Sequence, residues 1–163
     1  MDLSLINPGD VIVSRFMFGI VPYQHWALAS DKRCSKGYCY LISASERTGT
    51  VREEPAEDVI QGAPSYKADI VFKKSIPDVI EQARSQIDKW KYSLKDSNCE
   101  QFVNWAAGLG ITSKQVVNGA ALGVLGSTTT ALLCEKPTWL KILGVGVACF
   151  ALGVANTKAP EKK

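Results

Sequence analysis

Over the first 75 residues, apolar positions come in short runs separated by turn-forming residues, a pattern typical of β-strands. The clearest runs predict strands at residues 11–13, 25–29 and 38–42, and weaker runs predict strands at 48–52 and 70–72. The acidic stretch at residues 53–58 predicts a solvated loop between them. The first half of the chain is therefore expected to build a sheet.

After residue 75 the apolar spacing changes to that of a helix. Pro77 suits the first helical position, and a helix over residues 77–90 is predicted from one apolar stripe: Val79, Ile80, Ala83, Ile87 and Trp90. A second helix is expected to start at the capping-box pattern Ser97 to Glu100 and to end at Gly108 and Gly110. Strands followed by helices predict an α+β domain over residues 1–112.

The remaining residues, 113–163, form a tail of a different kind. Two runs without charge, residues 115–134 and 142–157, flank a short charged interruption. A helix needs about 20 apolar residues to cross a bilayer, so the tail predicts membrane insertion or anchoring. The alternative is a pair of helices packed on the soluble domain. Basic residues at the end of the chain favour a cytosolic C-terminus, and hence a hairpin: Lys158, Lys162 and Lys163.

Charge and cysteine usage narrow the function classes. Residues 1–112 carry 13 basic and 14 acidic side chains, whereas residues 113–163 carry 6 and 2. This balance does not suit a nucleic-acid binder, which normally presents a basic face. The start of the chain lacks the basic and apolar segments of a secretory signal, so the five cysteines are expected to be reduced thiols in the cytoplasm. With a single histidine in the chain, neither a metal site nor a cofactor site is predicted.

Two residues carry candidate chemistry. Cys99 is predicted in the first turn of a helix, where unpaired backbone N–H groups and the helix dipole favour a thiolate. His25, the only histidine, lies on a predicted strand and could serve as the base that activates this thiol. Taken separately, a buried cysteine or a lone histidine is more often structural, so the residues around them decide the interpretation.

Three segments resemble the lecithin retinol acyltransferase-like family, most closely its phospholipase A/acyltransferase branch. These are Pro8-Gly9-Asp10-Val11-Ile12, Tyr23-x-His25-Trp26-Ala27, and the block from Tyr92 to Val103 that contains Asn98-Cys99-Glu100. The resemblance covers residues 8–112. It implies a circularly permuted papain-like α+β domain, with antiparallel sheet and helices, followed by a hydrophobic helical C-terminal tail.

The resemblance also implies roles for individual residues. Cys99 would be the nucleophile that takes an acyl group as a thioester, and His25 would be its base. Tyr23 and the backbone N–H of Cys99 would help to bind the oxyanion. The family usually has a third polar residue, commonly histidine, that orients the imidazole; here Tyr40 or Ser43 would have to take that role.

The expected function is a thiol-dependent phospholipase A1/A2 and acyltransferase that acts on glycerophospholipids. It would work on the cytoplasmic face of an intracellular membrane, held there by the tail, with water or an amine as acyl acceptor. The missing second histidine supports an alternative, a non-enzymatic membrane-remodelling or partner-binding protein that retains the fold. A soluble cysteine amidase or peptidase on the same fold is a third possibility, which the apolar tail disfavours.

Overall fold

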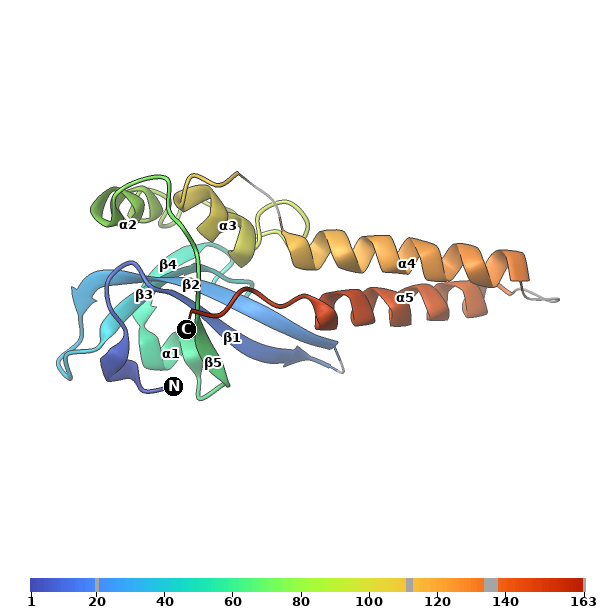
Figure 1. Ribbon diagram of the computed structural model, residues 1–163, viewed down its shortest axis with the longest axis horizontal. Coiled ribbons are helices and arrows are strands. Elements are labelled where there is room, and N and C mark those ends of the chain that lie inside the picture. The colour runs from blue at the N-terminus through green and yellow to red at the C-terminus, as the bar shows by residue number, and fades with distance from the viewer. Residues whose placement is uncertain (20, 111–112, 134–137, 163) are drawn as a thin grey trace. The chain divides into compact units, whose positions relative to one another are not determined.

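The computed structural model describes residues 1–19, 21–110, 113–133 and 138–162, and its centre is a five-stranded antiparallel sheet (Figure 1). The strand order is β4-β3-β2-β1-β5. The strands are β1 (Val11–Phe18), β2 (Val21–Arg33), β3 (Cys39–Ala44), β4 (Val51–Pro55) and β5 (Ser65–Ala68). A sheet combined with helices confirms the predicted α+β class.

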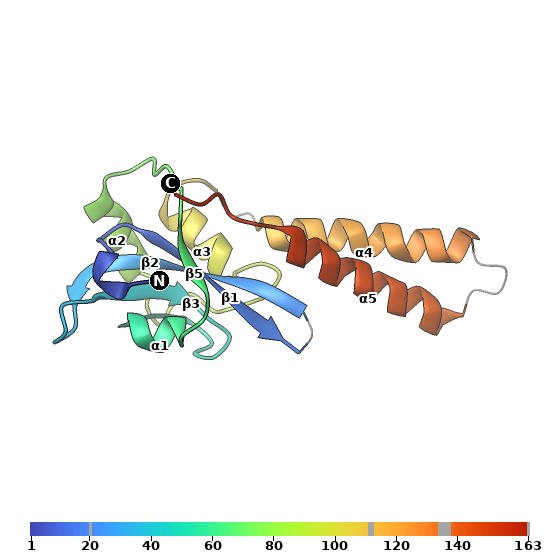
Figure 2. The same ribbon diagram turned by 60° about the horizontal axis from the view of Figure 1, so that its bottom comes forward.

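Helices cover both faces of this sheet (Figures 1 and 2). One face carries α2 (Ile76–Arg84) and α3 (Cys99–Ala106), and the other carries α1 (Ala56–Ile60). Strand β2 serves both, since Trp26 and Leu28 belong to the apolar cluster of α2 and α3 whereas Ala27 and Ala29 belong to that of α1. Burial on both faces explains why this strand reads as a continuous apolar run in the sequence.

Three predicted elements differ from the structure. Residues 70–72 form no strand; Ile70 and Phe72 pack against the core without backbone partners in a sheet, and the strand lies earlier, at β5. The first predicted helix ends at Arg84 instead of residue 90, and the chain beyond it turns, with Asp88 in a left-handed backbone at φ of 62°. The predicted acidic loop at 53–58 is the end of β4 followed by α1.

The start of α3 is shifted by one residue from the predicted capping box. Asn98 is the capping residue: its side chain accepts a hydrogen bond from the backbone N–H of Gln101, at 3.0 Å. The Gln101 side chain in turn accepts one from the backbone N–H of Asn98, at 2.9 Å. Two donors at the helix start are thereby satisfied reciprocally. Cys99 is consequently the first residue of the helix.

The chain divides into two compact units. The first contains residues 1–16, 24–112 and 159–163, and the second contains residues 17–23 and 113–158. The second includes α4 (Lys114–Leu133) and α5 (Trp139–Asn156). The predicted tail of 113–163 thus contains a helical unit that ends at Lys158, while the residues after it belong with the sheet.

One helix in the described part of the chain, α5, is long and apolar enough to cross a membrane by length and composition. Only 17% of it is buried within the structure, unlike the core helix of a soluble protein. This finding weakly supports a membrane anchor at the C-terminal end of the chain.

Candidate functional site

Cys99 lies at the start of α3, which is the position expected of a nucleophilic thiol. It is the first residue of the helix, and the backbone N–H groups of Cys99 and Glu100 both act to lower the pKa of its thiol. Groups at this position have no partner inside the helix and carry the positive end of its dipole. The local geometry therefore favours negative charge at the sulfur.

The sulfur also lies against the backbone of β2 on both sides of His25. The Cys99 thiol donates to the carbonyl oxygen of Gln24, with 3.7 Å between sulfur and oxygen. A further hydrogen bond joins the sulfur to the backbone of Trp26. The structure thus brings the predicted nucleophile to the strand segment that carries the predicted base.

The imidazole of His25 has different neighbours from the sulfur. Its ring meets Phe16 of β1 edge-on, with 6.2 Å between ring centroids. Successive side chains of a strand point to opposite faces, which directs His25 to the face of Ala27, whereas Cys99 shares the cluster of Trp26. Among the described residues, no hydrogen bond joins the sulfur of Cys99 to the ring of His25. The Cys99–His25 dyad therefore stays a prediction.

Burial keeps both groups uncharged. It raises the pKa of the Cys99 thiol to about 11, and the nearby Glu100 carboxylate acts in the same direction. Burial likewise lowers the pKa of His25 to about 4, helped by the positive charge of Arg47. The sequence predicted a thiol acidified by the helix start; here desolvation outweighs the backbone hydrogen bonds. Proton transfer from thiol to imidazole is strongly unfavourable in this state.

The two candidate orienters of His25 lie at different places along β3. Leu41 pairs with Ala29, so Tyr40 lies about 16 Å along the strand from His25, at roughly 3.3 Å per residue. The Tyr40 ring instead packs under the ammonium of Lys32, 4.2 Å from nitrogen to centroid. This separation removes Tyr40 from the site.

Ser43 is placed far better. It follows Ile42, the partner of Leu28, and continuation of this register puts Ser43 opposite Ala27. It is 2% exposed and on the face of the sheet to which His25 points. Tyr23, the predicted oxyanion donor, belongs to the second unit and is 38% exposed.

Sequence reasoning missed three residues around the site. Gln24 holds Cys99 through its carbonyl oxygen, and its side-chain oxygen accepts a hydrogen bond from the backbone N–H of Ala159, at 3.4 Å. The indole N–H of Trp26 is buried and has no hydrogen-bond partner within the described residues. The Trp26 position could have been flagged from its place beside His25; no pattern in the sequence pointed to Gln24 or Ala159.

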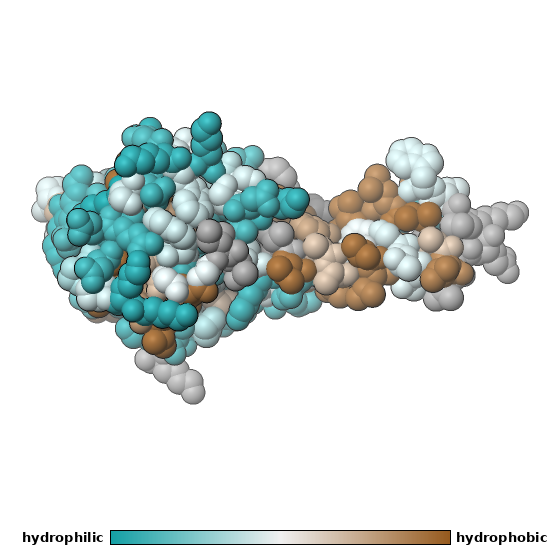
Figure 3. Space-filling model, turned by 90° about the horizontal axis from the view of Figure 1, so that it is seen from above, coloured by the Kyte–Doolittle hydropathy of each residue, from teal (hydrophilic) through white to brown (hydrophobic). Residues whose placement is uncertain are grey.

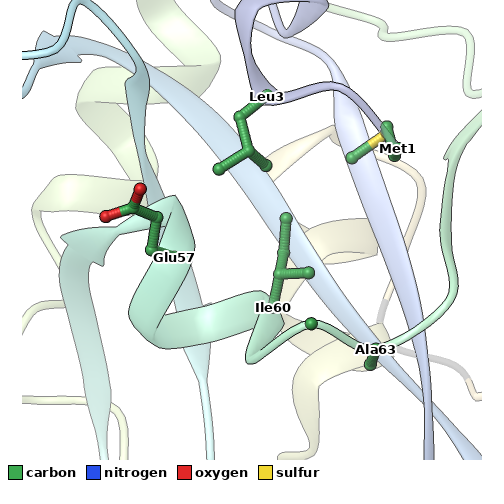
Figure 4. Close-up of a pocket in the computed structure, with 6 residues that line it drawn as sticks. Met1, Leu3, Glu57, Ile60 and Ala63 are labelled. Atoms are coloured by element: carbon green, nitrogen blue, oxygen red, sulfur yellow. The ribbon is translucent and has the colours of Figure 1, made fainter.

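A pocket of about 310 Å³ lies elsewhere, beside α1 (Figure 4). It is lined by Met1, Leu3, Glu57, Ile60, Gly62 and Ala63. Its single carboxylate, that of Glu57, is ion-paired with Lys36 at 2.9 Å. None of the predicted site residues lines it, so it is not the place where Cys99 would meet a substrate.

A family model described as lecithin retinol acyltransferase matches residues 4–108, which is more than half of the chain and includes both His25 and Cys99. A search of curated proteins found no match.

Proposed function

The chain belongs to the lecithin retinol acyltransferase family, and from this premise we propose that it is a thiol-dependent phospholipase and acyltransferase acting on glycerophospholipids. Family membership supports acyltransferase or phospholipase chemistry in general. The observation that supports the finer proposal is the position of Cys99, whose sulfur lies at the first residue of α3 and against the backbone that flanks His25.

The proposed reaction has two steps. The Cys99 sulfur attacks the carbonyl carbon of an acyl ester while its proton passes to the imidazole of His25. Collapse of the tetrahedral intermediate forms the thioester and breaks the ester C–O bond. The leaving lysophospholipid oxygen takes the proton from the His25 imidazolium. Water or an amine then attacks the thioester, regenerates the thiol and yields a fatty acid or an N-acyl product. The backbone N–H of Cys99 is the proposed oxyanion donor.

The resting arrangement has to change before this chemistry begins. A thiol with a pKa of about 11 and an imidazole with a pKa of about 4 do not exchange a proton readily. Cys99 is moreover only 5% exposed. We therefore propose that contact with lipid opens this end of β2, hydrates the sulfur and lets the His25 ring reach it.

A non-enzymatic role in membrane remodelling or partner binding is the second candidate. It is supported by the same two facts, namely that His25 and Cys99 are both buried in neutral form and that no hydrogen bond joins their side chains. On this alternative the motif persists as part of the core, and the chain binds membranes without turnover.

One measurement distinguishes the two candidate functions. Full-length protein is incubated with phosphatidylcholine vesicles that carry a radiolabelled acyl chain, and the released fatty acid and the mass of the intact protein are followed. We expect acyl release and an acyl adduct on Cys99, both abolished in Cys99→Ala. A matched control is Cys34→Ala, a half-buried cysteine outside the site, which should behave as the wild type.

Absence of release and adduct from a wild-type protein that still binds the vesicles would exclude the enzyme and leave the remodelling role. His25→Gln separates the base from the nucleophile: it should abolish turnover while the vesicles are still bound. Localisation at the cytoplasmic face is part of the proposal, and is tested by protease digestion of the sheet unit on intact organelles.

A further inference from the structure

The chain returns to the sheet unit after its last helix. Residues 159–162, which we call the return segment, run antiparallel to β5, with a bridge between Ala68 and Glu161. The backbone N–H of Asp69 donates to the carbonyl of Pro160 at 2.8 Å, and that of Lys162 donates to the carbonyl of Lys67 at 2.8 Å. The return segment is thus a backbone-paired part of the first unit.

Side chains hold the return segment as well. Ala159 is 5% exposed and belongs to the same apolar cluster as Cys99. The hydroxyl of Tyr66 donates to the Ala159 carbonyl at 3.3 Å, and Gln24 accepts from the Ala159 N–H. Lys162 lies 3.6 Å from the buried carboxylate of Asp10. Removing this segment from the sheet would break each of these interactions.

The chain leaves the first unit before α4 and returns to it after α5. The two helices form an antiparallel hairpin. The hairpin is closed by small residues. A Cβ on Gly119 would meet Phe150 and Val154 at 2.9 Å, and one on Gly153 would meet the carbonyl oxygen of Asn118 at 2.5 Å. Such close backbone approach through glycine is typical of helix pairs in membranes.

Large apolar side chains point away from the hairpin interface. Figure 3 shows hydrophobic residues gathered over α4 and α5. Exposed ones occur on both helices: Val117, Leu122, Val124, Leu125 and Leu132 on α4, and Leu140, Leu143, Val145, Val147 and Leu152 on α5. The sequence of α4 carries no charge after Lys114, and that of α5 carries only Lys141. At 1.5 Å per residue, each helix is about 27–30 Å long, which matches the hydrocarbon core of a bilayer.

From these observations we propose that α4 and α5 enter a lipid bilayer together, as a hairpin inserted from the side on which the sheet unit lies. A single crossing by α5 would carry Lys158 and the return segment to the far side and strip the segment from β5. Two crossings leave it in place and keep Lys114 and Lys158, at the two ends of the hairpin, on one side. The inference goes beyond the proposed function and does not depend on catalysis.

Lipid is the occupant that suits the outer surface of the hairpin. A partner helix would need small residues to approach closely, and the hairpin uses Gly119, Gly123, Gly126, Gly146 and Gly153 internally. Of the glycines in the two helices, only Gly144 has open space beyond its Cα. The surface that remains is formed by branched aliphatic side chains, which pack against acyl chains without a specific groove.

The number of crossings is tested by glycosylation mapping in microsomes. The sequence contains no Asn-x-Ser/Thr acceptor, so one acceptor appended after Lys163 reports the location of the C-terminus. We expect the full chain to resist carbonate extraction while the acceptor stays unmodified. A control lacking residues 114–133, in which α5 must cross alone, should be glycosylated. Glycosylation of the full chain, or its extraction by carbonate, would overturn the proposal.

Insertion depth is tested with Trp139, the first residue of α5 and 70% exposed. Full-length protein is added to phosphatidylcholine vesicles, and the Trp139 signal is isolated as the difference from Trp139→Phe. We expect quenching by brominated acyl chains and protection from iodide added outside. Quenching by external iodide would mean a hairpin lying on the surface, and no quenching by brominated lipid would mean a protein partner or second copy. Cys99→Ala should give the same results, which separates this proposal from the catalytic one.

Discussion

The two units bury opposite kinds of side chain. In the sheet unit the largest residues are inside: Phe102 is fully buried, with its ring centroid 5.4 Å from that of Trp90. On the described residues of the two long helices, the buried positions are Gly119 of α4 and Gly146, Gly153 and Val154 of α5, while leucines and valines face outward. One chain therefore contains two arrangements, one with its large apolar side chains inside and one with them outside.

The difference is the one expected if the sheet unit meets water and the helical unit meets lipid, as we propose. Water drives large apolar side chains inward, at about 25 cal/mol per Å² of buried surface. Lipid supplies no such force, so helices associate there through close backbone contact and a few hydrogen bonds. The hairpin has such bonds at its polar end, where the amide of Asn118 donates to the hydroxyl of Thr157 at 3.0 Å.

The strongest test of the comparison is a large-to-small change in each unit. Phe102→Ala should lower the free energy of unfolding by about 3–5 kcal/mol, because it removes a fully buried ring. The matched change Leu122→Ala, on the outside of α4, should lower it by less than about 0.5 kcal/mol. Denaturant unfolding followed by near-UV circular dichroism measures both. Equal losses in free energy of unfolding would mean that the hairpin has a hydrophobic core like that of a water-soluble protein.

A smaller effect is expected from acid, and only in the sheet unit. His25 has a pKa of about 4 when folded and about 6.5 when unfolded, so the unfolded chain binds more protons between these values. The free energy of unfolding should fall by about 3 kcal/mol as the pH drops from 6.5 to 4. His25→Gln should remove that part of the slope. A slope unchanged by the substitution would show that His25 is not held neutral.

The glycines of α5 give a finer comparison within the helical unit. A leucine at Gly153 would collide with the backbone of α4, whereas one at Gly144 meets open space. Gly153→Leu should therefore destabilise the hairpin by about 1–3 kcal/mol, and Gly144→Leu should not. Thermal loss of helical circular dichroism in detergent micelles measures this. Equal melting temperatures for the two variants would show that close packing at Gly153 does not contribute to the stability of the hairpin.

The smallest change is expected from the exposed ion pairs of the sheet unit. Lys36 and Glu57 lie 2.9 Å apart, but both side chains are about half exposed or more. Solvent screening leaves such pairs with little net effect. Lys36→Ala should leave the denaturation midpoint unchanged within error, in low and in high salt. A clear loss at low salt would assign a structural role to the surface charges of α1.

Much of this architecture could be predicted from local patterns. The run 25–29 indicated β2, and the polar residues before Cys99 indicated a helix start, which the structure displaces by one residue. What escaped prediction depends on distant contacts. The return segment shows no alternation of apolar and polar residues. Backbone hydrogen bonds to Lys67 and Asp69 of the sheet unit hold it in place. Residues 70–72 read as a strand because Ile70 and Phe72 pack against the core, and apolar residues at such positions give the same signal as a strand.

The site shows the same limit. Sequence pattern predicted Cys99 as the nucleophile and His25 as its base, and a thiol at a helix start is ordinarily acidified. Whether such a thiol is acidic depends on how much water it keeps, which is set by the cluster packed around it and not by its neighbours in the sequence. The choice between Tyr40 and Ser43 likewise needed the register of β3 against β2.

The return segment also protects the sheet from self-association. Strand β5 lies at the end of the strand order, and an uncovered end strand offers its backbone N–H and C=O groups to any other chain. Residues 159–162 form backbone hydrogen bonds with part of that outer edge of β5. A version of the protein cut before Ala159 to improve solubility would therefore lose this cover and present a template for intermolecular β-pairing and aggregation.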